Sequence, residues 1–332
     1  VDAIQVGGYE PSTAIDFEIP KKYGLRQTIA DTLGIGGIFR ALRTIPVMLR
    51  YCRTIEKYAP DAWLLNYTNP MASITGAIQK ATEVKTVGLC HSVQGCAEHL
   101  CRQLDLPDDD IQSTIAGINH QGWVLEITRH GKDLYPEIKR RAEKPEYKKK
   151  NAVRFEIMKR FGYFVTESSE HSAEYVPWFI KKDRPDLIDT FHIPLDEYPR
   201  RCVNQIEGWE KMRAEMLEGD QPLEHKPTSE YASRIIHAMI AGEPTKIGGN
   251  VLNWNLIPNL PYGCCVEAPC LVDRSGVTPC HVGPLPMQCA ALTRTNVNVH
   301  ELTIEAALTG KKEHLYQAAL LDPHTSSELA ID

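Results

Sequence analysis

The stretch "AWLLNYTNPMASITGAIQKATEVKTVGLCHSVQG", residues 62–95, holds two short apolar segments with a longer segment of helical character between them. Residues 62–67 and 84–89 predict buried strands, because each is a brief apolar run bounded by polar residues. Asn69-Pro70 indicates a helix start, since proline is favoured in the first helical turn. A strand, a helix and a second strand in this order are typical of a parallel, doubly wound sheet.

The segments on either side continue this alternation. Residues 1–6 predict another strand, which Gly7-Gly8 ends, and residues 93–104 predict the helix after the second strand. Residues 113–136 alternate between apolar and polar side chains, as half-buried strands do. Residues 24–60 contain a helix, on which apolar side chains recur every three or four residues: Ile38, Leu42, Ile45 and Leu49. The first part of the chain is therefore predicted to be a Rossmann-type parallel sheet.

One glycine-rich segment, "GIGGIF" at 34–39, looks like a dinucleotide fingerprint. Its sixth position is Phe39 rather than Gly or Ala, and no convincing strand precedes it. We interpret it as a tight turn rather than as a phosphate-binding loop.

The pattern changes in the second half of the chain. Amphipathic helices are predicted at 151–165, 230–242 and 297–310, and a strand at 264–273 runs into a turn at 274–277. This mixture indicates an α+β domain. We expect residues 1–115 to be the dinucleotide-binding part and residues 116–332 to be the substrate and catalytic domain.

Composition and charge exclude several classes of partner. The 332 residues include 37 basic and 43 acidic side chains, a net charge of −6. Nucleic-acid-binding proteins are normally basic, so no such partner is expected, and the basic run at 137–150 predicts a solvated connector because Glu and Pro dilute it. No apolar run reaches the 18 residues of a membrane span, so no membrane partner is expected either.

The ten cysteines are scattered along the chain, and Cys264 and Cys265 are adjacent. This distribution is typical of a reduced protein rather than of one held by disulfides. A cytoplasmic location follows as the expectation.

Candidates for chemistry stand where the predicted strands end. Cys90 and His91 follow one strand, and His120 follows another in "GINHQGW", residues 117–123. Ligands of doubly wound sheets bind outside the carboxyl ends of the strands. A cysteine and a histidine without a CxxC or His-x3-His partner motif favour an open site for an exchangeable catalytic metal. A small core cysteine and a structural histidine stay open as the alternative.

A second polar segment, "VTESSEHSAEYVPWF" at 165–179, is rich in groups that transfer protons or bind sugars. Tyr175 and Trp178 could stack on a sugar ring, and Glu170 and His171 could bind its hydroxyls. A polar loop between aromatic core residues explains the pattern equally well. The remaining candidates are three asparagines: Asn66, Asn69 and Asn119.

Six motifs together resemble glycoside hydrolase family 4, most closely its bacterial α-galactosidase branch. They are "LLNYTNPMASIT", "VGLCHSVQG", "GINH", "GYFVTESSEHSAEYVPWFI", "PLDEYP" and "NLPYGCCVEAPCLVD". The resemblance covers nearly the whole chain. It implies a Rossmann-type domain, a lactate/malate-dehydrogenase-like second domain, the cofactors NAD and Mn²⁺, and homo-oligomers, usually dimers or tetramers. The family's amino-terminal Gly-rich loop is not found, so we expect a fragment that lacks this loop and the extreme carboxyl terminus.

The resemblance also implies an activity, the hydrolysis of glycosidic bonds in α-galactosides such as melibiose. Most glycosidases use two carboxylates, and the NAD-dependent family is an exception. In the implied mechanism NAD takes a hydride from C3 of the sugar, which acidifies the proton on C2. A base removes that proton, the C1–O bond breaks by elimination, water adds, and the hydride returns.

Roles for single residues follow from the resemblance. Cys90 and His120 match the Mn²⁺ ligands, and Asn69 matches the asparagine that contacts substrate beside the nicotinamide. Tyr175 lies where the base is expected. His91 occupies the position after the metal-binding cysteine, where some members of the family carry an aspartic acid as the general acid. A tyrosine with a reference pKa of about 10 needs a nearby cation to ionise near neutrality.

The expected binding residues are Asn119 and His171 for the substrate and Asn66 with Asn69 for the cofactor. Three other functions stay open. They are another glycosidase of the family (an α-glucosidase or α-galacturonidase), an NAD-dependent hydroxy-acid dehydrogenase, and an inactive fragment. A dehydrogenase would normally have an Arg beside its catalytic His, and none stands near His120 in the sequence.

Overall fold

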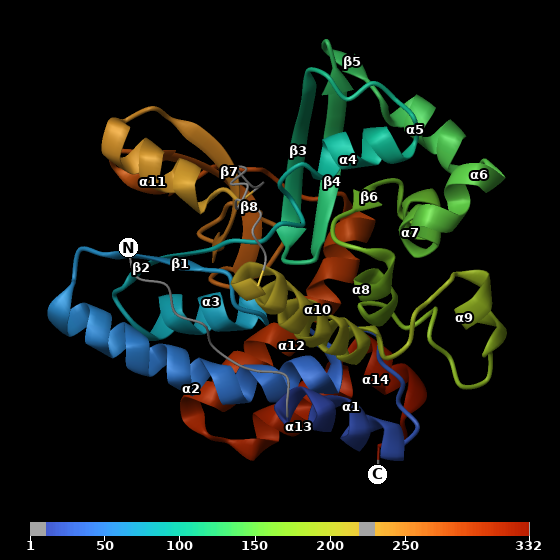
Figure 1. Cartoon of the computed structure of the whole chain (residues 1–332), viewed down its shortest axis with the longest axis horizontal. Coiled ribbons are helices and arrows are strands. Elements are labelled where there is room, and N and C mark those ends of the chain that lie inside the picture. The colour runs from blue at the N-terminus through green and yellow to red at the C-terminus, as the bar shows by residue number, and fades with distance from the viewer. Residues whose placement is uncertain (1–10, 219–229, 332) are drawn as a thin grey trace.

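A nine-stranded sheet runs through the computed structural model, which describes residues 11–218 and 230–331 (Figure 1). Its strand order is β1-β2-β7-β8-β3-β4-β5, and β6 pairs with β4 and β9 with β8. The strands are β1 (Trp63–Asn66), β2 (Lys85–Gly88), β3 (Ile111–Ile118), β4 (Gln121–Arg129), β5 (Lys132–Asp133), β6 (Phe164–Val165), β7 (Thr245–Leu252), β8 (Cys265–Asp273) and β9 (Gly276–Pro279). The strand and turn predicted at 1–8 lie outside the described residues.

Helices cover the sheet and its edges. In the first half they are α1 (Ser12–Lys22), α2 (Gly34–Tyr58), α3 (Met71–Ala81), α4 (Cys96–Gln103), α5 (Tyr135–Ala142), α6 (Pro145–Lys148), η1 (Lys149–Asn151) and α7 (Ala152–Phe161). The others are α8 (Ser169–Glu174), α9 (Asp186–Thr190), α10 (Glu197–Glu218), α11 (Ala232–Ala241), α12 (Met287–Thr309), α13 (Lys312–Leu321) and α14 (Pro323–Glu328). The chain packs α3 against β2 and β7, and α2 and α12 against α3.

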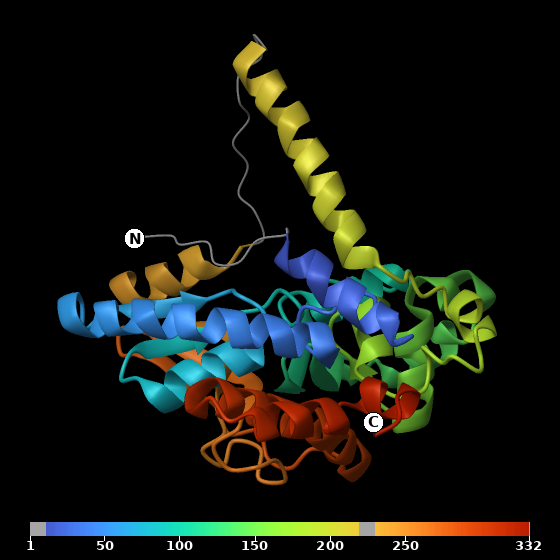
Figure 2. The same ribbon diagram turned by 90° about the horizontal axis from the view of Figure 1, so that it is seen from below.

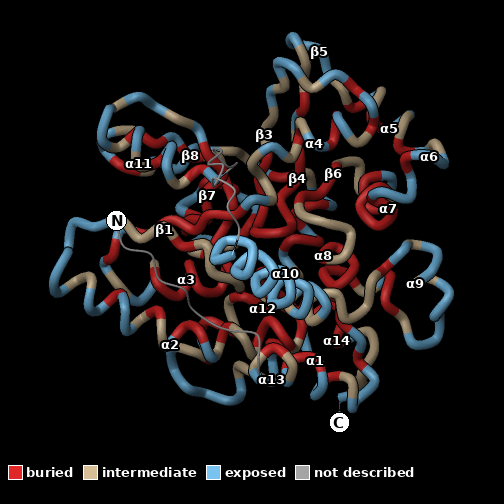
Figure 3. Tube along the Cα trace, in the orientation of Figure 1, coloured by how far each residue is buried: buried red, intermediate tan, exposed pale blue. Residues whose placement is uncertain are grey.

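The strand–helix–strand unit predicted from residues 62–95 is confirmed. Strands β1 and β2 are parallel, with Trp63 opposite Lys85, and α3 connects them. The first eight residues of α3 are all buried, which explains why their side chains are apolar or small (Figure 3). The α/β fold class with a Rossmann-type part is confirmed.

Beyond β2 the sheet differs from a continuous parallel one. Strand β2 pairs with β7 in antiparallel orientation, and β7, β8, β3 and β4 follow as an antiparallel series. The alternation in residues 113–136 is therefore that of an antiparallel hairpin, β3–β4, that joins the sheet through β8. The domain boundary at residue 115 falls inside β3 and stays a prediction.

The "GIGGIF" segment is helical rather than a turn, because it forms the first turns of α2. A Cβ on Gly36 would lie 2.7 Å from the backbone oxygen of Ala30, and one on Gly37 would lie 2.5 Å from the backbone of Thr32. The glycines thus let the loop at 27–33 lie directly against the helix. That loop carries residues of the candidate site.

The basic run at 137–150 is not a connector. It spans most of α5, all of α6 and part of η1, and Ile138, Ala142 and Tyr147 are buried in a core cluster there. Its charges lie on the outer face, where Arg140 and Arg141 pair with Glu137. These helices are not predicted from the sequence, because the many charged residues make the few buried apolar positions hard to recognise.

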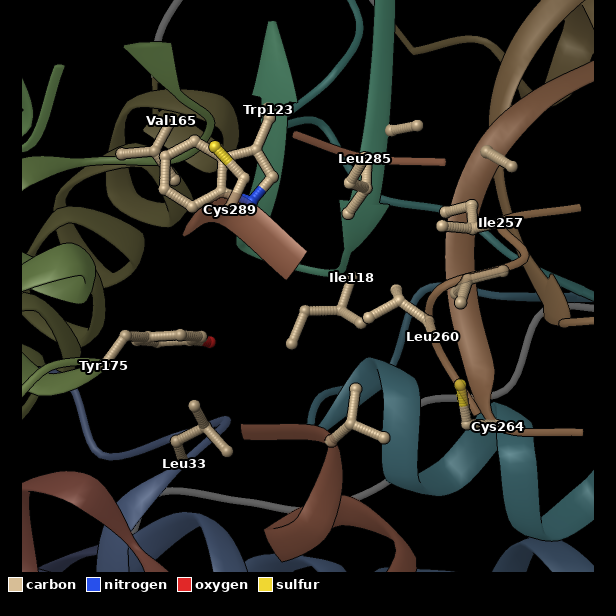
Figure 4. Close-up of a cluster of buried hydrophobic side chains, with 14 of the residues drawn as sticks. Leu33, Ile118, Trp123, Val165, Tyr175, Ile257, Leu260, Cys264, Leu285 and Cys289 are labelled. Atoms are coloured by element: carbon tan, nitrogen blue, oxygen red, sulfur yellow. The ribbon is translucent and has the colours of Figure 1, made fainter. Parts of the chain in front are cut away.

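The largest core cluster includes residues on both sides of the hairpin turn between β3 and β4. Leu33, Ile118, Trp123 and Tyr175 belong to it, and the Trp123 indole donates a hydrogen bond to Thr293 on α12. In Figure 4 the Tyr175 side chain extends from its own segment toward Ile118. The core therefore supports the residues that follow β3.

Candidate active site

Cys90 and His120 meet although β2 and β3 are not neighbours. Two strands, β7 and β8, lie between them in the sheet. Cys90 follows β2, His120 lies in the turn after β3, and the distance from Cys90 Sγ to His120 Nε2 is 3.3 Å. Both side chains are buried. The structure thus brings together the two residues that the sequence predicts as metal ligands.

A strained turn presents His120. It lies in the two-residue connection of the β3–β4 hairpin, where Ile118 pairs with Gln121. Its φ of +62° is in the left-handed region, which residues other than glycine seldom adopt. Such strain persists where the surroundings fix it, and it is common at functional sites. The hydroxyl of Thr32 lies 3.2 Å from His120 Nδ1 and orients the ring.

Glu167 joins this pair, and it is not among the candidates from the sequence. Its Oε2 lies 3.5 Å from His120 Nε2, and Cys90, His120 and Glu167 each offer one ligand atom within 4.8 Å of the others. Glu167 follows β6 with a φ of +70°, and the buried Arg154 donates to its backbone oxygen. The motif "TESSEH" contains Glu167, but it also contains four other acidic or hydroxyl residues, so the sequence gave no reason to choose Glu167 among them.

The charges in this cluster balance one another. Burial opposes a charge on His120, but Glu167 and Cys90 outweigh it and raise the pKa of His120 to about 10. Burial likewise opposes a charge on Glu167, but His120 and His171 outweigh it and lower the pKa of that carboxyl. The Cys90 and Glu167 side chains therefore favour a positive charge between them, which the protonated His120 supplies in this structure.

A second group of possible ligands shares His120. Asp31, His120 and His171 are all buried, and each offers a ligand atom within 4.8 Å of the others. His171 lies 3.5 Å from Asp31 through Nε2 and 3.4 Å from Glu167 through Nδ1. Burial opposes the charge of Asp31, but His171 lowers its pKa below the usual range. His171, expected to bind substrate, thus lies inside the cluster.

Asn69 reaches the cluster from β1. Its Nδ2 donates to Asp31 Oδ2 at 3.0 Å, and its Oδ1 accepts from the backbone N–H of Met71. A cis peptide bond joins it to Pro70. Because both ends of its amide are held, Asn69 has one orientation beside the Asp31 carboxylate.

Glu174 holds the loop that carries Asp31. Its two carboxylate oxygens accept hydrogen bonds from the backbone N–H groups of Thr28, Ile29 and Ala30. Glu174 is itself buried in α8, close to His171 in sequence. The helix and the loop therefore move as one unit, and the loop residue Thr32 stays in place against His120.

Tyr175 and Asn119 lie beside the cluster with polar atoms that have no partner among the described residues. The ring centre of Tyr175 is 6.4 Å from that of His120, and its hydroxyl is buried and unpaired. Burial and the charge of Asp31 raise the pKa of Tyr175 well above its ordinary value. Both polar atoms of the Asn119 side chain are buried and unpaired as well. Unpaired buried groups are costly unless a ligand or water completes them.

Asn66 and His91 are not brought into the cluster. Asn66 uses its side chain inside the β1–α3 turn, where it donates to Thr75 Oγ1 and accepts from the N–H of Thr68. His91 is 58% exposed and lies 2.7 Å from Glu230, with its ring beside Tyr67. Neither contact settles the cofactor or acid role predicted for these residues.

The other aromatic and acidic candidates of residues 165–179 point elsewhere. Trp178 stacks on Phe161 with ring centres 5.6 Å apart, in a hollow of about 400 Å³ that Phe179 and Phe191 also line. Glu170 lies 3.4 Å from Arg201 on α10. Only His171 and Tyr175 of this segment's four candidates reach the cluster.

A buried polar row crosses the sheet behind the cluster. Gly88 of β2, Asn250 of β7, Glu267 of β8 and Gly117 of β3 are paired in register. Asn250 donates to Glu267 Oε1 at 3.0 Å, whereas Glu267 Oε2 has no hydrogen-bond partner among the described residues. Burial raises the pKa of Glu267 to about 7. This carboxyl too was missed, since it lies inside an ordinary strand pattern.

The donor set fits a divalent cation. A thiol, an imidazole and a carboxylate converge, and they come from β2, the β3–β4 turn and the β6–α8 turn. Carboxylate oxygen is a ligand that Mn²⁺ prefers, and thiolate is a softer one. Glu167 therefore adds the type of ligand that the sequence-predicted pair lacks.

Comparisons with known proteins identify the family of the chain. Residues 1–106 match the model of the family 4 glycosyl hydrolases, and residues 115–325 match the model of their C-terminal domain. The chain belongs to glycosyl hydrolase family 4. It is 60% identical over 332 residues to an α-galactosidase of Bacillus subtilis, covering 100% of this chain and 77% of that protein. It is 28% identical to an α-galacturonidase of Thermoanaerobacter italicus, covering 93% and 72% of the two chains.

Solved structures of family 4 enzymes share the fold. The protein lplD of Bacillus subtilis superposes with a TM-score of 0.85 at 25% identity, over 96% of this chain and 77% of that one. A 6-phospho-α-glucosidase from gut microorganisms, solved with NAD and Mn²⁺, gives 0.77 at 21% identity, over 97% and 76%. The family 4 chain is therefore a glycosidase with an α/β fold. Among its described residues, no helix is both long enough and apolar enough to cross a bilayer.

Proposed function

We propose that this family 4 chain hydrolyses α-galactosides with NAD and Mn²⁺. The observation that carries the proposal is the convergence of Cys90, His120 and Glu167, whose ligand atoms lie within 4.8 Å of one another. The 60% identity to the α-galactosidase of Bacillus subtilis supports galactose as the sugar. The NAD and Mn²⁺ in the 6-phospho-α-glucosidase structure support the choice of cofactors.

Cys90, His120 and Glu167 are the proposed ligands of Mn²⁺. When bound, the ion would supply positive charge that stabilises negative charge on the sugar, and NAD would supply a hydride acceptor. Asn69, held by Asp31 and by the Met71 N–H, is proposed to contact substrate beside the nicotinamide. Asn66 acts through the β1–α3 turn that it shapes, and this turn follows the carboxyl end of a parallel strand, where dinucleotides bind.

Tyr175 is the proposed base, and its phenolate oxygen removes the proton from C2 of the sugar. Its hydroxyl is buried and has no partner among the described residues, so it is free to face substrate. Burial and Asp31 keep the phenol neutral, and a cation bound nearby shifts the balance toward the phenolate. Asn119 and His171 are the proposed partners of sugar hydroxyls. His91 is the proposed acid only if its exposed side chain turns toward the site.

We propose a cytoplasmic enzyme that associates with copies of itself. All ten cysteines are free, and Cys90 loses its role as a ligand when it is oxidised. A reducing compartment preserves the thiol. Self-association agrees with the family resemblance and with exposed apolar residues on α10.

The test is hydrolysis of nitrophenyl glycosides by the 332-residue chain with NAD, Mn²⁺ and a thiol reductant. We expect release of galactose without net formation of NADH, and loss of activity when either Mn²⁺ or the reductant is left out. NADH formed in proportion to the substrate consumed would show a dehydrogenase instead. Preference for the glucoside or galacturonide would move the chain to another branch of the family.

A further inference from the structure

Helix α10 projects from the body of the molecule, and beyond its base it stands clear of the other described elements (Figure 2). It has 22 residues, and none of them is buried. Every residue from Val203 to Glu218 is exposed. A helix in water gains most of its stability from packing an apolar face, so an uncovered helix of this kind is marginally stable.

One face of α10 has the pattern of a helix that packs against another helix. Cys202, Ile206, Trp209 and Met216 follow one another at spacings of four, three and seven, and Arg213 occupies the position between the last two. This is the heptad spacing of a helix–helix seam. Ile206, Trp209 and Met216 are each about half exposed, at 52%, 51% and 50%. The opposite face carries Glu207, Lys211 and Glu218.

We propose that this seam of α10 packs antiparallel against the same helix of a second copy of the chain. The inference rests on the self-association proposed above and names the surface that carries it. Arg213 decides between the possible occupants, because a single cation in an apolar seam requires an acidic or aromatic group opposite it.

The helix itself supplies the groups that Arg213 requires. In an antiparallel pair centred near residue 211, each Arg213 lies beside Trp209 and Glu210 of the other copy, and Ile206 lies opposite Met216. The contact is thus the same from both sides, as a twofold dimer demands. Within one chain Arg213 reaches Glu210 only at 3.9 Å, which leaves the guanidinium available.

Other arrangements fit less well. A parallel pair would place the two Arg213 side chains opposite each other in the seam, where like charges repel. A lipid surface favours helices whose polar face is basic, and the polar face of α10 is mixed. The second copy is therefore the occupant that the charges favour.

The base of α10 connects this contact to the candidate site. The Tyr198 N–H donates to the backbone oxygen of Thr28, and Arg40 donates to the Tyr198 hydroxyl. Arg201 lies beside Glu170, the neighbour of His171. Association of two α10 helices would thus hold the loop at 27–33, which carries Asp31.

Helix α1 widens the surface. Its exposed residues Ile15 and Ile19, and Tyr23 directly after it, recur every fourth position. Lys21 joins α1 to Asp196, the residue before α10, at 3.0 Å. A standard interface buries about 1,200–2,000 Å² in total. One pair of helices falls short of that area, so we expect the α1 residues to contribute.

Sedimentation equilibrium of the full 332-residue chain tests the proposal. We expect a dimer for the unchanged chain, and at least tenfold weaker dimerisation for Trp209→Ala and Arg213→Glu. The reversed pair Glu210→Arg with Arg213→Glu restores dimerisation, because the two charges only change places across the contact. Lys211→Glu, on the opposite face of the same helix, is the matched control and leaves the dimer intact. Thermal unfolding of each variant checks that the body remains folded.

The outcomes separate this proposal from the one on which it rests. A monomeric unchanged chain would refute both self-association and its surface. A dimer that tolerates Trp209→Ala and Arg213→Glu would refute the α10 contact alone and leave the catalytic proposal as it stands. Failure of the reversed pair to restore a dimer that Arg213→Glu breaks would refute the antiparallel arrangement.

Discussion

Two carboxyl groups, the half-buried Glu167 and the buried Glu267, lie within electrostatic reach of His120, and their surroundings have opposite effects. Glu167 faces two histidines, which lower its pKa against the effect of burial. Glu267 has one amide partner for one oxygen and none among the described residues for the other, and burial raises its pKa to about 7. The comparison separates a region built to hold positive charge from a region that favours a neutral carboxyl.

The largest effect is expected from removing a ligand in the charged region. Cys90→Ser replaces the thiol by a hydroxyl of similar shape, and His120→Ala removes the imidazole shared by both groups of possible ligands. Each should weaken Mn²⁺ binding by more than the 10- to 100-fold typical of residues that only support a ligand. Electron paramagnetic resonance of free Mn²⁺ measures this without an activity assay.

The matched control for Cys90→Ser is Cys280→Ser, because Cys280 is an exposed cysteine outside the cluster. It should bind Mn²⁺ like the unchanged chain. Normal Mn²⁺ affinity and normal activity in Cys90→Ser would rule out the thiol as a ligand.

A smaller loss is expected for Glu167→Gln. The amide keeps the shape of the side chain but removes the charge that faces His120 and His171. We expect Mn²⁺ affinity to fall by about 10- to 100-fold, less than on removal of a ligand, because the amide oxygen of glutamine can still coordinate a cation. Glu170→Gln is the control, since Glu170 lies on the same segment and pairs with Arg201 instead. Equal Mn²⁺ affinity in the two variants would remove Glu167 from the ligand set.

Glu267→Gln should change stability rather than ion binding. The pKa of Glu267 is about 7 in the folded chain and lies above the ordinary value of 4.5. Between pH 4.5 and pH 7, Glu267 therefore keeps its proton in the folded chain and loses it in the unfolded chain. The stability that this proton provides is complete below pH 4.5 and is lost as the pH rises to 7. The loss amounts to about 3 kcal/mol at most.

Thermal unfolding of Glu267→Gln at pH 5 and pH 8 checks this sign. A neutral side chain should raise the stability relative to the unchanged chain more at pH 8 than at pH 5. Glu126→Gln on the exposed part of β4 is the control and should show no such difference. A variant that is less stable at pH 8 would show that the carboxylate is the favoured form in the fold.

The same comparison shows what the sequence could predict. Strand ends at Asn66 and Cys90 follow from local apolar runs, and these runs correctly gave β1, α3 and β2. Local patterns favoured a metal site made of Cys90 and His120, and the family resemblance implied it. Neither predicted that two strands from residues 245–273 separate β2 from β3. Local periodicity does not indicate which strands, distant in sequence, lie between β2 and β3 in the sheet.

Glu167, Asp31 and Glu267 show why the rest of the site was missed. Arg154 holds the backbone of Glu167, and Glu174 holds the backbone of the loop that carries Asp31. Arg154 and Glu174 lie outside the local sequence patterns around Glu167 and Asp31. Glu267 lies in a strand whose other residues are mostly buried and apolar. A carboxyl group within such a strand becomes informative only when its partner Asn250, on another strand, is known.

The smallest effect is expected at His91, next to Cys90 in sequence but outside the charged region. Its side chain is 58% exposed and pairs with Glu230, which is also exposed. A general acid contributes about 10²- to 10⁴-fold to the rate. The kcat of His91→Ala on a nitrophenyl galactoside therefore shows whether His91 is the general acid or takes no part in the reaction. We expect a loss well below that range and unchanged Mn²⁺ affinity, because the His91 side chain pairs with Glu230 and is not part of the group of possible ligands. A fall of about 100-fold in kcat with unchanged Mn²⁺ affinity would instead show that His91 turns inward as the acid. In that case the charged region would extend to the surface when substrate binds.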